Sequence, residues 1–147
     1  MNDLHELNKF LSYIHMGNET FRLYYEKACE LDNKELKRLI TSIQEVFKTH
    51  EELVTGILER NDFDCSDDVT LIGKMALIME ELKLVDDPFK ICERAIKAVN
   101  NGLLSGLKMV YYNKNLDEEI KEAMKDVISD YTDILEDIND FILDNYC

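Results

Sequence analysis

Long amphipathic stretches with very few helix-breaking residues constrain the fold of this chain more than any other feature. The 147 residues include one proline, Pro88, and five glycines. Apolar residues recur three and four positions apart, which places them on one face of an α-helix. Because a half-buried strand needs alternation at every second residue instead, the pattern predicts an all-α chain. In the first stretch the apolar positions are Leu4, Leu7, Leu11, Ile14, Phe21, Tyr25 and Ala28.

Two later stretches have the same spacing and are expected to bury one face each. His50 is the polar residue within the first of these faces. That face consists of Leu36, Ile40, Ile43, Phe47, His50, Val54 and Ile57. The face of the last stretch consists of Ile120, Met124, Val127, Tyr131, Ile134, Ile138 and Phe141.

Breaks in this periodicity divide the chain into five expected helices. Asp32 and Asn33 supply turn and capping chemistry, and Asp87 before Pro88 is a helix start, since Asp caps a helix and Pro suits its first position. The length and a hydrophobic content of 46% fit one domain with one core, residues 1–147. The expected helices cover residues 3–30, 34–60, 69–84, 88–114 and 117–145.

A short internal repeat suggests how the four long helices are connected. Tyr24-Tyr25-Glu26-Lys27, before the first turn, is similar to Tyr111-Tyr112-Asn113-Lys114, before the last. Two helical hairpins of similar design are therefore expected, joined by a long crossover that carries the shorter helix at 69–84. In such a layout the second and third long helices run parallel.

Three short phrases and this layout resemble the ferritin-like superfamily, and within it a bacterial family of unknown function. The phrases are Leu7-Asn8-Lys9-Phe10-Leu11, Tyr25-Glu26-Lys27-Ala28, and Asp86-Asp87 followed by Ile91-Cys92-Glu93-Arg94-Ala95. The resemblance implies a ferritin-like four-helix bundle of two hairpins with a helical crossover.

The resemblance also implies a di-iron ligand set, of which this chain lacks most members. Active relatives take one Glu from each of two helices and a Glu-x-x-His from each of the other two. Here His50 would be such a histidine, but the residue three before it is Phe47, which has no ligand atom. By the internal repeat, the matching positions of the last helix are Tyr131 and Ile134.

A residual metal site around His50 remains one interpretation. Its donors would be His50, Asp133 and Glu19, or Asp130, and its metal would be iron or manganese. Counting about 1.5 Å per residue from the two tight turns puts His50 and Asp133 at nearly the same height. The other interpretation is a buried core histidine, hydrogen-bonded to neighbours such as Asn18 and Asp133.

The charge of the chain excludes some partners. With 31 acidic and 17 basic residues, the formal charge is −14, which repels nucleic-acid phosphates and anionic lipid. Neither a signal peptide nor an apolar run of about 20 residues is visible, so a cytoplasmic protein with no membrane association is expected.

The four cysteines are widely spaced, and reduced thiols are expected. If the second and third long helices are parallel, Cys29, Cys92 and Cys147 fall near one end of the bundle and Cys65 near the other. A thiol cluster for metal, or an intermolecular disulfide through Cys147, is the alternative to independent thiols. No Cys/His or Ser/His/Asp set suggests nucleophilic catalysis.

The expected function is therefore that of a non-catalytic ferritin-like bundle without a cofactor, acting through a homodimer or a protein partner. Apolar residues of the crossover, such as Leu77 and Leu84, would form a dimer surface. The alternative is a metal-binding ferritin-like protein of iron or oxidative-stress physiology, with a degenerate site at His50.

Overall fold

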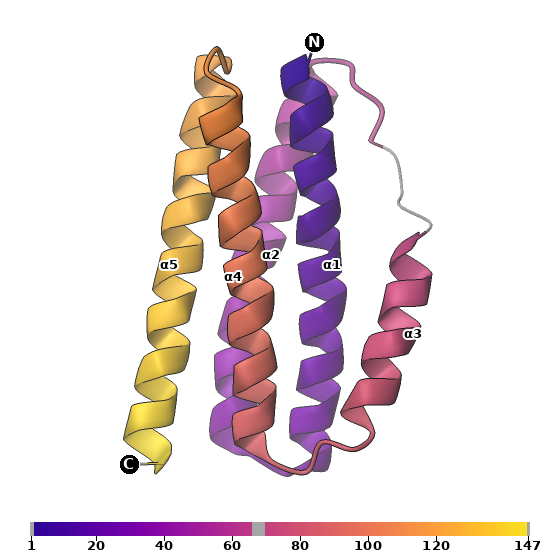
Figure 1. The fold of residues 1–147 in the computed structure, drawn as a ribbon, viewed down its shortest axis with the longest axis vertical. Helices are drawn as coiled ribbons and strands as arrows, with labels where there is room; N and C mark the ends of the chain where they lie inside the picture. The colour runs from indigo at the N-terminus through magenta and orange to yellow at the C-terminus, as the bar shows by residue number, and fades with distance from the viewer. Residues whose placement is uncertain (1, 66–69, 147) are drawn as a thin grey trace.

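Four long helices stand side by side in a bundle, and a shorter helix lies on its outside (Figure 1). The computed structural model describes residues 2–65 and 70–146. Within these ranges no strand is present, and none of the helices combines the length and the apolar character needed to cross a membrane. The prediction of an all-α chain is confirmed. The helices are α1 (Asn2–Glu30), α2 (Lys34–Arg60), α3 (Thr70–Leu82), α4 (Pro88–Tyr112) and α5 (Glu118–Tyr146).

The starts of α2 and α4 are fixed by the capping residues that the sequence indicates. Asn33 Oδ1 accepts a hydrogen bond of 2.9 Å from the backbone N–H of Leu36. Asp87 Oδ1 accepts one of 2.9 Å from Phe89, with Pro88 in the first turn. Each cap satisfies a backbone donor that the helix itself leaves free.

Helix α3 is shorter than the expected range of 69–84. Residue 69 lies outside the described residues, and the helix ends at Leu82. Leu82 and Val85 are buried, whereas Leu84 is 87% exposed. The backbone N–H of Val85 donates a hydrogen bond of 3.1 Å to the carbonyl of Leu82, which forms the turn after the helix.

The four long helices form two antiparallel hairpins, α1 with α2 and α4 with α5. The hairpins meet through α1 against α4 and α2 against α5. Helices α2 and α4 run in the same direction (Figure 1), so the connection between them returns along the length of the bundle. That connection contains α3, which packs against α1.

Each end of the bundle has a hydrogen bond that joins the two hairpins. At one end Asp3, at the start of α1, accepts a bond of 2.9 Å from the backbone N–H of Asp117, in the turn before α5. At the other end Asn33, in the turn before α2, donates to the hydroxyl of Tyr146 in the last turn of α5, at 3.4 Å. Each end of the described chain therefore contacts the turn of the opposite hairpin.

The predicted apolar faces of α2 and α5 are buried at every position. The first stretch departs from the prediction at two positions, of which Leu4 is partly buried. Tyr25 is exposed, and its neighbour Tyr24 is buried instead. Phe21 and Ala28, on either side of this pair, are fully buried as expected, so the difference is confined to the turn that contains Tyr24 and Tyr25.

Candidate functional site

The turn of α2 that contains Phe47 and His50 points into the middle of the bundle. Positions three apart lie on the same face of a helix, and both side chains are buried. His50 is 1% exposed, and Thr20 is the other buried polar residue of the described core. A buried imidazole requires a polar partner, since unpaired buried polar groups destabilise a fold.

Asp130 of α5 is the partner of His50. The Nε2 atom of His50 lies 2.8 Å from Oδ2 of Asp130, whose side chain is 44% exposed. Burial lowers the pKa of His50 below its usual 6.5, although the hydrogen bond and charge of Asp130 act in the opposite direction. The neutral ring therefore donates its Nε2–H to the carboxylate. The buried Nδ1 atom has no hydrogen-bond partner among the described residues.

Aromatic rings from three helices form a series of contacts that ends at His50. The ring of Tyr131, from α5, lies 5.3 Å from His50 and 5.8 Å from Phe47, between centroids. Phe47 in turn lies 5.1 Å from Phe21 of α1. All three contacts are edge-to-face, the arrangement that aromatic quadrupoles favour. We call Phe21, Phe47, His50 and Tyr131 the aromatic cluster.

Two glycines within helices give the aromatic cluster its space. A Cβ atom at Gly17 of α1 would lie 3.3 Å from Phe47, and one at Gly102 of α4 would lie 3.0 Å from Tyr131. Neither glycine has a positive φ, so the backbone does not require glycine at these positions. Their role is to leave room for the two rings.

The structure does not bring the predicted ligand residues together. Asp133 is exposed, and Glu19 forms an ion pair of 3.0 Å with Arg22 on its own helix. Asn18 donates a hydrogen bond to Glu51 rather than to His50. The expected contact between His50 and Asp133 is replaced by the contact with Asp130.

The rotation of α5 explains this replacement. Asp130 directly precedes the buried Tyr131 and therefore lies at the edge of the buried face. Asp133 follows two residues after Tyr131, about 200° around the helix, on the solvent side. The partner of His50 on α5 is therefore predicted by the angle of a residue around the helix, and not by its height along the bundle.

The residues present do not fit a di-iron centre. Among residues 2–65 and 70–146, no three His, Cys, Asp or Glu side chains lie close enough to hold a metal ion together. His50 and Asp130 are two donors, and Phe47 stands where a ligating Glu would be required. The aromatic cluster fills the space in which further donors would have to converge.

A groove of about 1090 Å³ opens beside the aromatic cluster, between α1, α3 and α4. Its lining includes Phe21, Phe47 and Tyr131 of the cluster, together with Gly17 and Gly102. Sequence reasoning missed this groove. The two glycines were its detectable signal, since each removes a side chain from a helix face that would otherwise be filled.

The cysteines do not form a cluster in the described residues. Cys29 and Cys92 are near the end of the bundle where α1 ends and α4 begins, but Cys29 is exposed and Cys92 is buried. Cys65 is exposed, beyond the last residue of α2 at the other end, and Cys147 lies outside the described residues. Burial raises the pKa of the Cys92 thiol to about 11.

Comparison with known proteins adds no relative. No family model matches the chain, and no curated protein or solved structure is significantly similar to it. The class of this protein is defined by its geometry: an all-α bundle with an aromatic core and an open groove.

Proposed function

We propose that this protein is a non-catalytic, ferritin-like four-helix bundle that acts by homo-oligomerisation or by binding a protein partner. Two antiparallel hairpins, a parallel α2 and α4, and a crossover with its own helix support the ferritin-like assignment. One observation supports the absence of catalysis most strongly. Phe47 occupies the Glu position of the Glu-x-x-His turn, and its ring packs against Phe21 and Tyr131.

The chemistry of the cluster agrees with this proposal. A di-iron site needs several carboxylates and imidazoles that converge from four helices. Phe47, Tyr131 and Ile134, at three of the matching positions, are aromatic or aliphatic and are buried in the core. The Nε2–H of His50 is already donated to Asp130. His50 is 1% exposed, so its ring lies within the core and is not accessible to a substrate.

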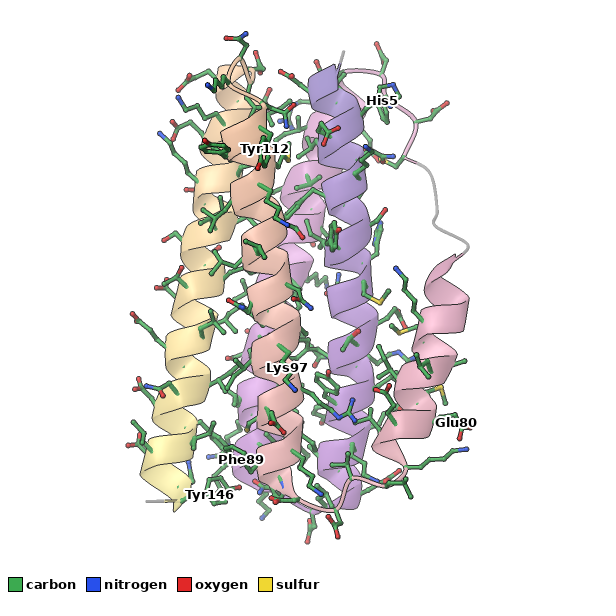
Figure 2. All side chains as sticks on the ribbon, in the orientation of Figure 1. His5, Glu80, Phe89, Lys97, Tyr112 and Tyr146 are labelled. Carbon is green, nitrogen blue, oxygen red and sulfur yellow. The ribbon has the colours of Figure 1, made fainter. Side chains whose placement is uncertain are left out.

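The outer surface of the crossover supports binding to another chain. Leu77 is 61% exposed, Met79 is 50% exposed and Leu84 is 87% exposed. Met79 lies two residues after Leu77, about 200° around α3, and Phe89, in the first turn of α4, is exposed on the side toward α5 (Figure 2). Exposed large apolar side chains are typical of protein interfaces. We infer that the crossover surface, defined by Leu77 and Leu84, is the interface.

Light scattering after size-exclusion chromatography tests the interface. The wild type is expected to be a dimer at micromolar concentrations, and the double variant Leu77→Glu/Leu84→Glu a monomer. Leu143→Glu is the matched control, because Leu143 is half exposed on α5, which does not belong to the crossover surface. If the wild type stays monomeric at high concentration, homo-oligomerisation is rejected, and binding to a different protein is the remaining form of the proposal.

A residual iron or manganese site is the second candidate. The His50–Asp130 pair and the unpartnered Nδ1 atom of His50 are the observations in its favour. Metal analysis of protein purified without a histidine tag, compared with His50→Ala, separates the two candidates. Stoichiometric metal that is lost in the variant would overturn the non-catalytic proposal.

A further inference from the structure

A second apolar surface lies along α4, outside the face that packs in the core. Apolar residues recur there every seven positions, which is the spacing of a helix that packs along the length of another helix. The repeat consists of Phe89, Ile96, Leu103 and Val110. Three exposed apolar residues lie beside it: Leu104, Leu107 and Tyr111.

This surface faces away from α1 and α3. Arg94 marks the side of α4 that faces α3, because it forms an ion pair of 2.7 Å with Glu81. Leu107 lies 13 residues after Arg94 and therefore about 220° around the helix from it. Phe89 lies about five full turns before Leu107 and points in the same direction, and it is exposed on the side toward α5 (Figure 2). The apolar surface of α4 therefore borders α5.

Helix α5 extends the apolar surface. Ile128 marks the side of α5 that contacts α4, since a Cβ atom at Gly106 of α4 would lie 3.2 Å from its Cγ1 atom. Leu135 and Ile142 follow Ile128 at intervals of seven residues and are partly buried. Leu143 is half exposed and lies about 60° around the helix from Ile128. We call the surface formed by Phe89, Leu104, Leu107, Tyr111 and Leu143 the α4–α5 face.

A basic edge borders this face on α4. The helix contains four basic residues and one acidic residue, Glu93, in a chain with a formal charge of −14. Lys97 and Lys108 lie about 80° and 100° around the helix from Leu107, beyond Leu104. Both lysines are exposed, and neither forms an ion pair with another described residue. Each therefore offers a positive charge to a molecule that lies on the face.

An acidic edge borders the face on α5. This helix contains ten acidic residues and two basic residues, Lys121 and Lys125, which lie in its first half. Glu136 and Asp140 are exposed and lie about 20° and 60° around the helix from Leu143, on the side away from α4. The apolar face therefore lies between positive charge on one helix and negative charge on the other.

A single helix is the occupant that these features favour. The seven-residue repeats on α4 and α5 are typical of helices that pack against a further helix. From Phe89 to Tyr111 the face is about 33 Å long, the length of a helix of about 22 residues. A second copy of the chain would bring another formal charge of −14 to the face, and like charges repel each other.

We propose that the α4–α5 face binds an amphipathic helix of a partner protein, with acidic residues along one edge and basic residues along the other. Its apolar side packs on the exposed apolar residues of the face. Its acidic edge lies along Lys97 and Lys108, and its basic edge lies along Glu136 and Asp140. The inference rests on the proposed role in binding a protein, and it names the class of partner.

Three synthetic peptides of about 22 residues test this proposal. They share the same leucines on the apolar side and differ in their edges. One has glutamate along one edge and lysine along the other, the second has lysine along both edges, and the third has glutamate along both. Fluorescence anisotropy of the labelled peptides is measured at about 0.15 M salt, which screens long-range attraction. The mixed peptide is expected to bind most tightly, although the net charge of the protein favours the all-lysine peptide.

A double variant at the centre of the face locates the peptide. Leu104→Glu/Leu107→Glu should weaken binding of the mixed peptide by about 10-fold or more, since it places two charges in the apolar contact. Both leucines are half exposed, so the variant should fold. Leu77→Glu/Leu84→Glu, at the crossover surface, should bind the mixed peptide like the wild type. This control separates the two proposals, because peptide binding does not depend on a dimer at the crossover surface.

A second pair of variants tests the charges. Lys97→Glu/Lys108→Glu should weaken binding of the mixed peptide by about 3- to 10-fold and strengthen binding of the all-lysine peptide. Lys34→Glu/Lys48→Glu changes the net charge by the same amount on α2, which does not belong to the face. This control should leave the order of the three peptides unchanged.

Three results would overturn the proposal. The first is a mixed peptide that binds no more tightly than the all-lysine peptide. The second is an unchanged affinity in Leu104→Glu/Leu107→Glu. The third is a wild-type oligomer that this variant converts to a monomer in light scattering, because a second copy of the chain would then occupy the face.

Discussion

His50 and Asp130 are joined across the bundle by a hydrogen bond of 2.8 Å between Nε2 and Oδ2. The two residues belong to α2 and α5, which come from different hairpins. This bond therefore connects the hairpins at the only polar position of the buried face of α2.

Removing the partner of His50 should destabilise the fold. Asp130→Ala leaves a buried Nε2–H without its acceptor, which costs about 1 kcal/mol, at the low end of the range because Asp130 is half exposed and water can enter. Chemical denaturation measures the loss. Asp133→Ala is the matched control, since this exposed carboxylate on the same helix should change stability by less than about 0.5 kcal/mol. Equal losses in the two variants would contradict the assigned pairing.

Stability should fall as the pH drops below about 6.5, because of His50. Its folded-state pKa is lowered by burial, so in mildly acidic solution the unfolded chain binds a proton that the folded chain does not. The contribution of His50 to the free energy of unfolding is complete above pH 6.5, the pKa of histidine in the unfolded chain. It is lost as the pH falls toward the lower pKa of His50 in the folded chain. Unfolding curves between pH 8 and pH 5 should show a steeper decline for the wild type than for His50→Gln. Parallel curves would show that His50 is not responsible.

Alanine at two helical glycines should have opposite effects. Gly102→Ala places a Cβ atom 3.0 Å from Tyr131, and the resulting crowding costs about 1–2 kcal/mol after the gain in helix propensity. Gly73→Ala in α3 has no atom within 4 Å of its new Cβ, so it should stabilise the protein by about 0.5–1 kcal/mol. Thermal and denaturant unfolding of both variants check the signs. Stabilisation by Gly102→Ala would mean that Tyr131 moves aside easily.

Tyr131→Phe should leave stability unchanged to within about 1 kcal/mol, or raise it, since the hydroxyl loses no hydrogen bond to a described residue. This outcome would be unusual for a tyrosine that is 2% exposed. A loss of 2 kcal/mol or more in denaturant unfolding would indicate that the hydroxyl has a partner within the folded chain.

The cysteines should differ in reactivity. In a Cys147→Ser background, Cys29 and Cys65 are exposed and should react rapidly with a disulfide reagent at pH 8. Cys92 is buried and its pKa is raised to about 11, so it should react only when the protein unfolds. Stopped-flow absorbance counts the fast and slow thiols, and the slow phase should vanish in Cys92→Ser. A third fast thiol would mean that the start of α4 opens readily.

The helices and their buried faces could be predicted because they depend on local spacing. Pro88 after Asp87 marks the start of α4 whatever the helix packs against. The buried faces of α2 and α5 follow from the spacing of their apolar residues alone. The first helix shows the limit of that reasoning. Tyr24 and Tyr25 lie three and four residues after Phe21, so the spacing alone permits either of them on the buried face.

The site could be predicted only in part. His50 was placed correctly in the core, but its partner depends on the rotation of α5, which the count of residues along the bundle ignores. The groove was missed because it depends on where α3 docks. No spacing within residues 70–82 indicates that Lys74 and Ile78 would line a groove together with residues of α1 and α4.

The hydrogen bonds from the backbone N–H of Asp117 to Asp3 and from Asn33 to Tyr146 oppose sliding of the hairpins at the two ends of the bundle. Helix pairs with similar apolar faces can slide past each other by one turn, about 5.4 Å, and still bury similar surface. Such a slip of one hairpin would break both bonds at once. The alignment of the two hairpins, and with it the position of Gly17 beside Phe47 and of Gly102 beside Tyr131, is therefore supported at both ends.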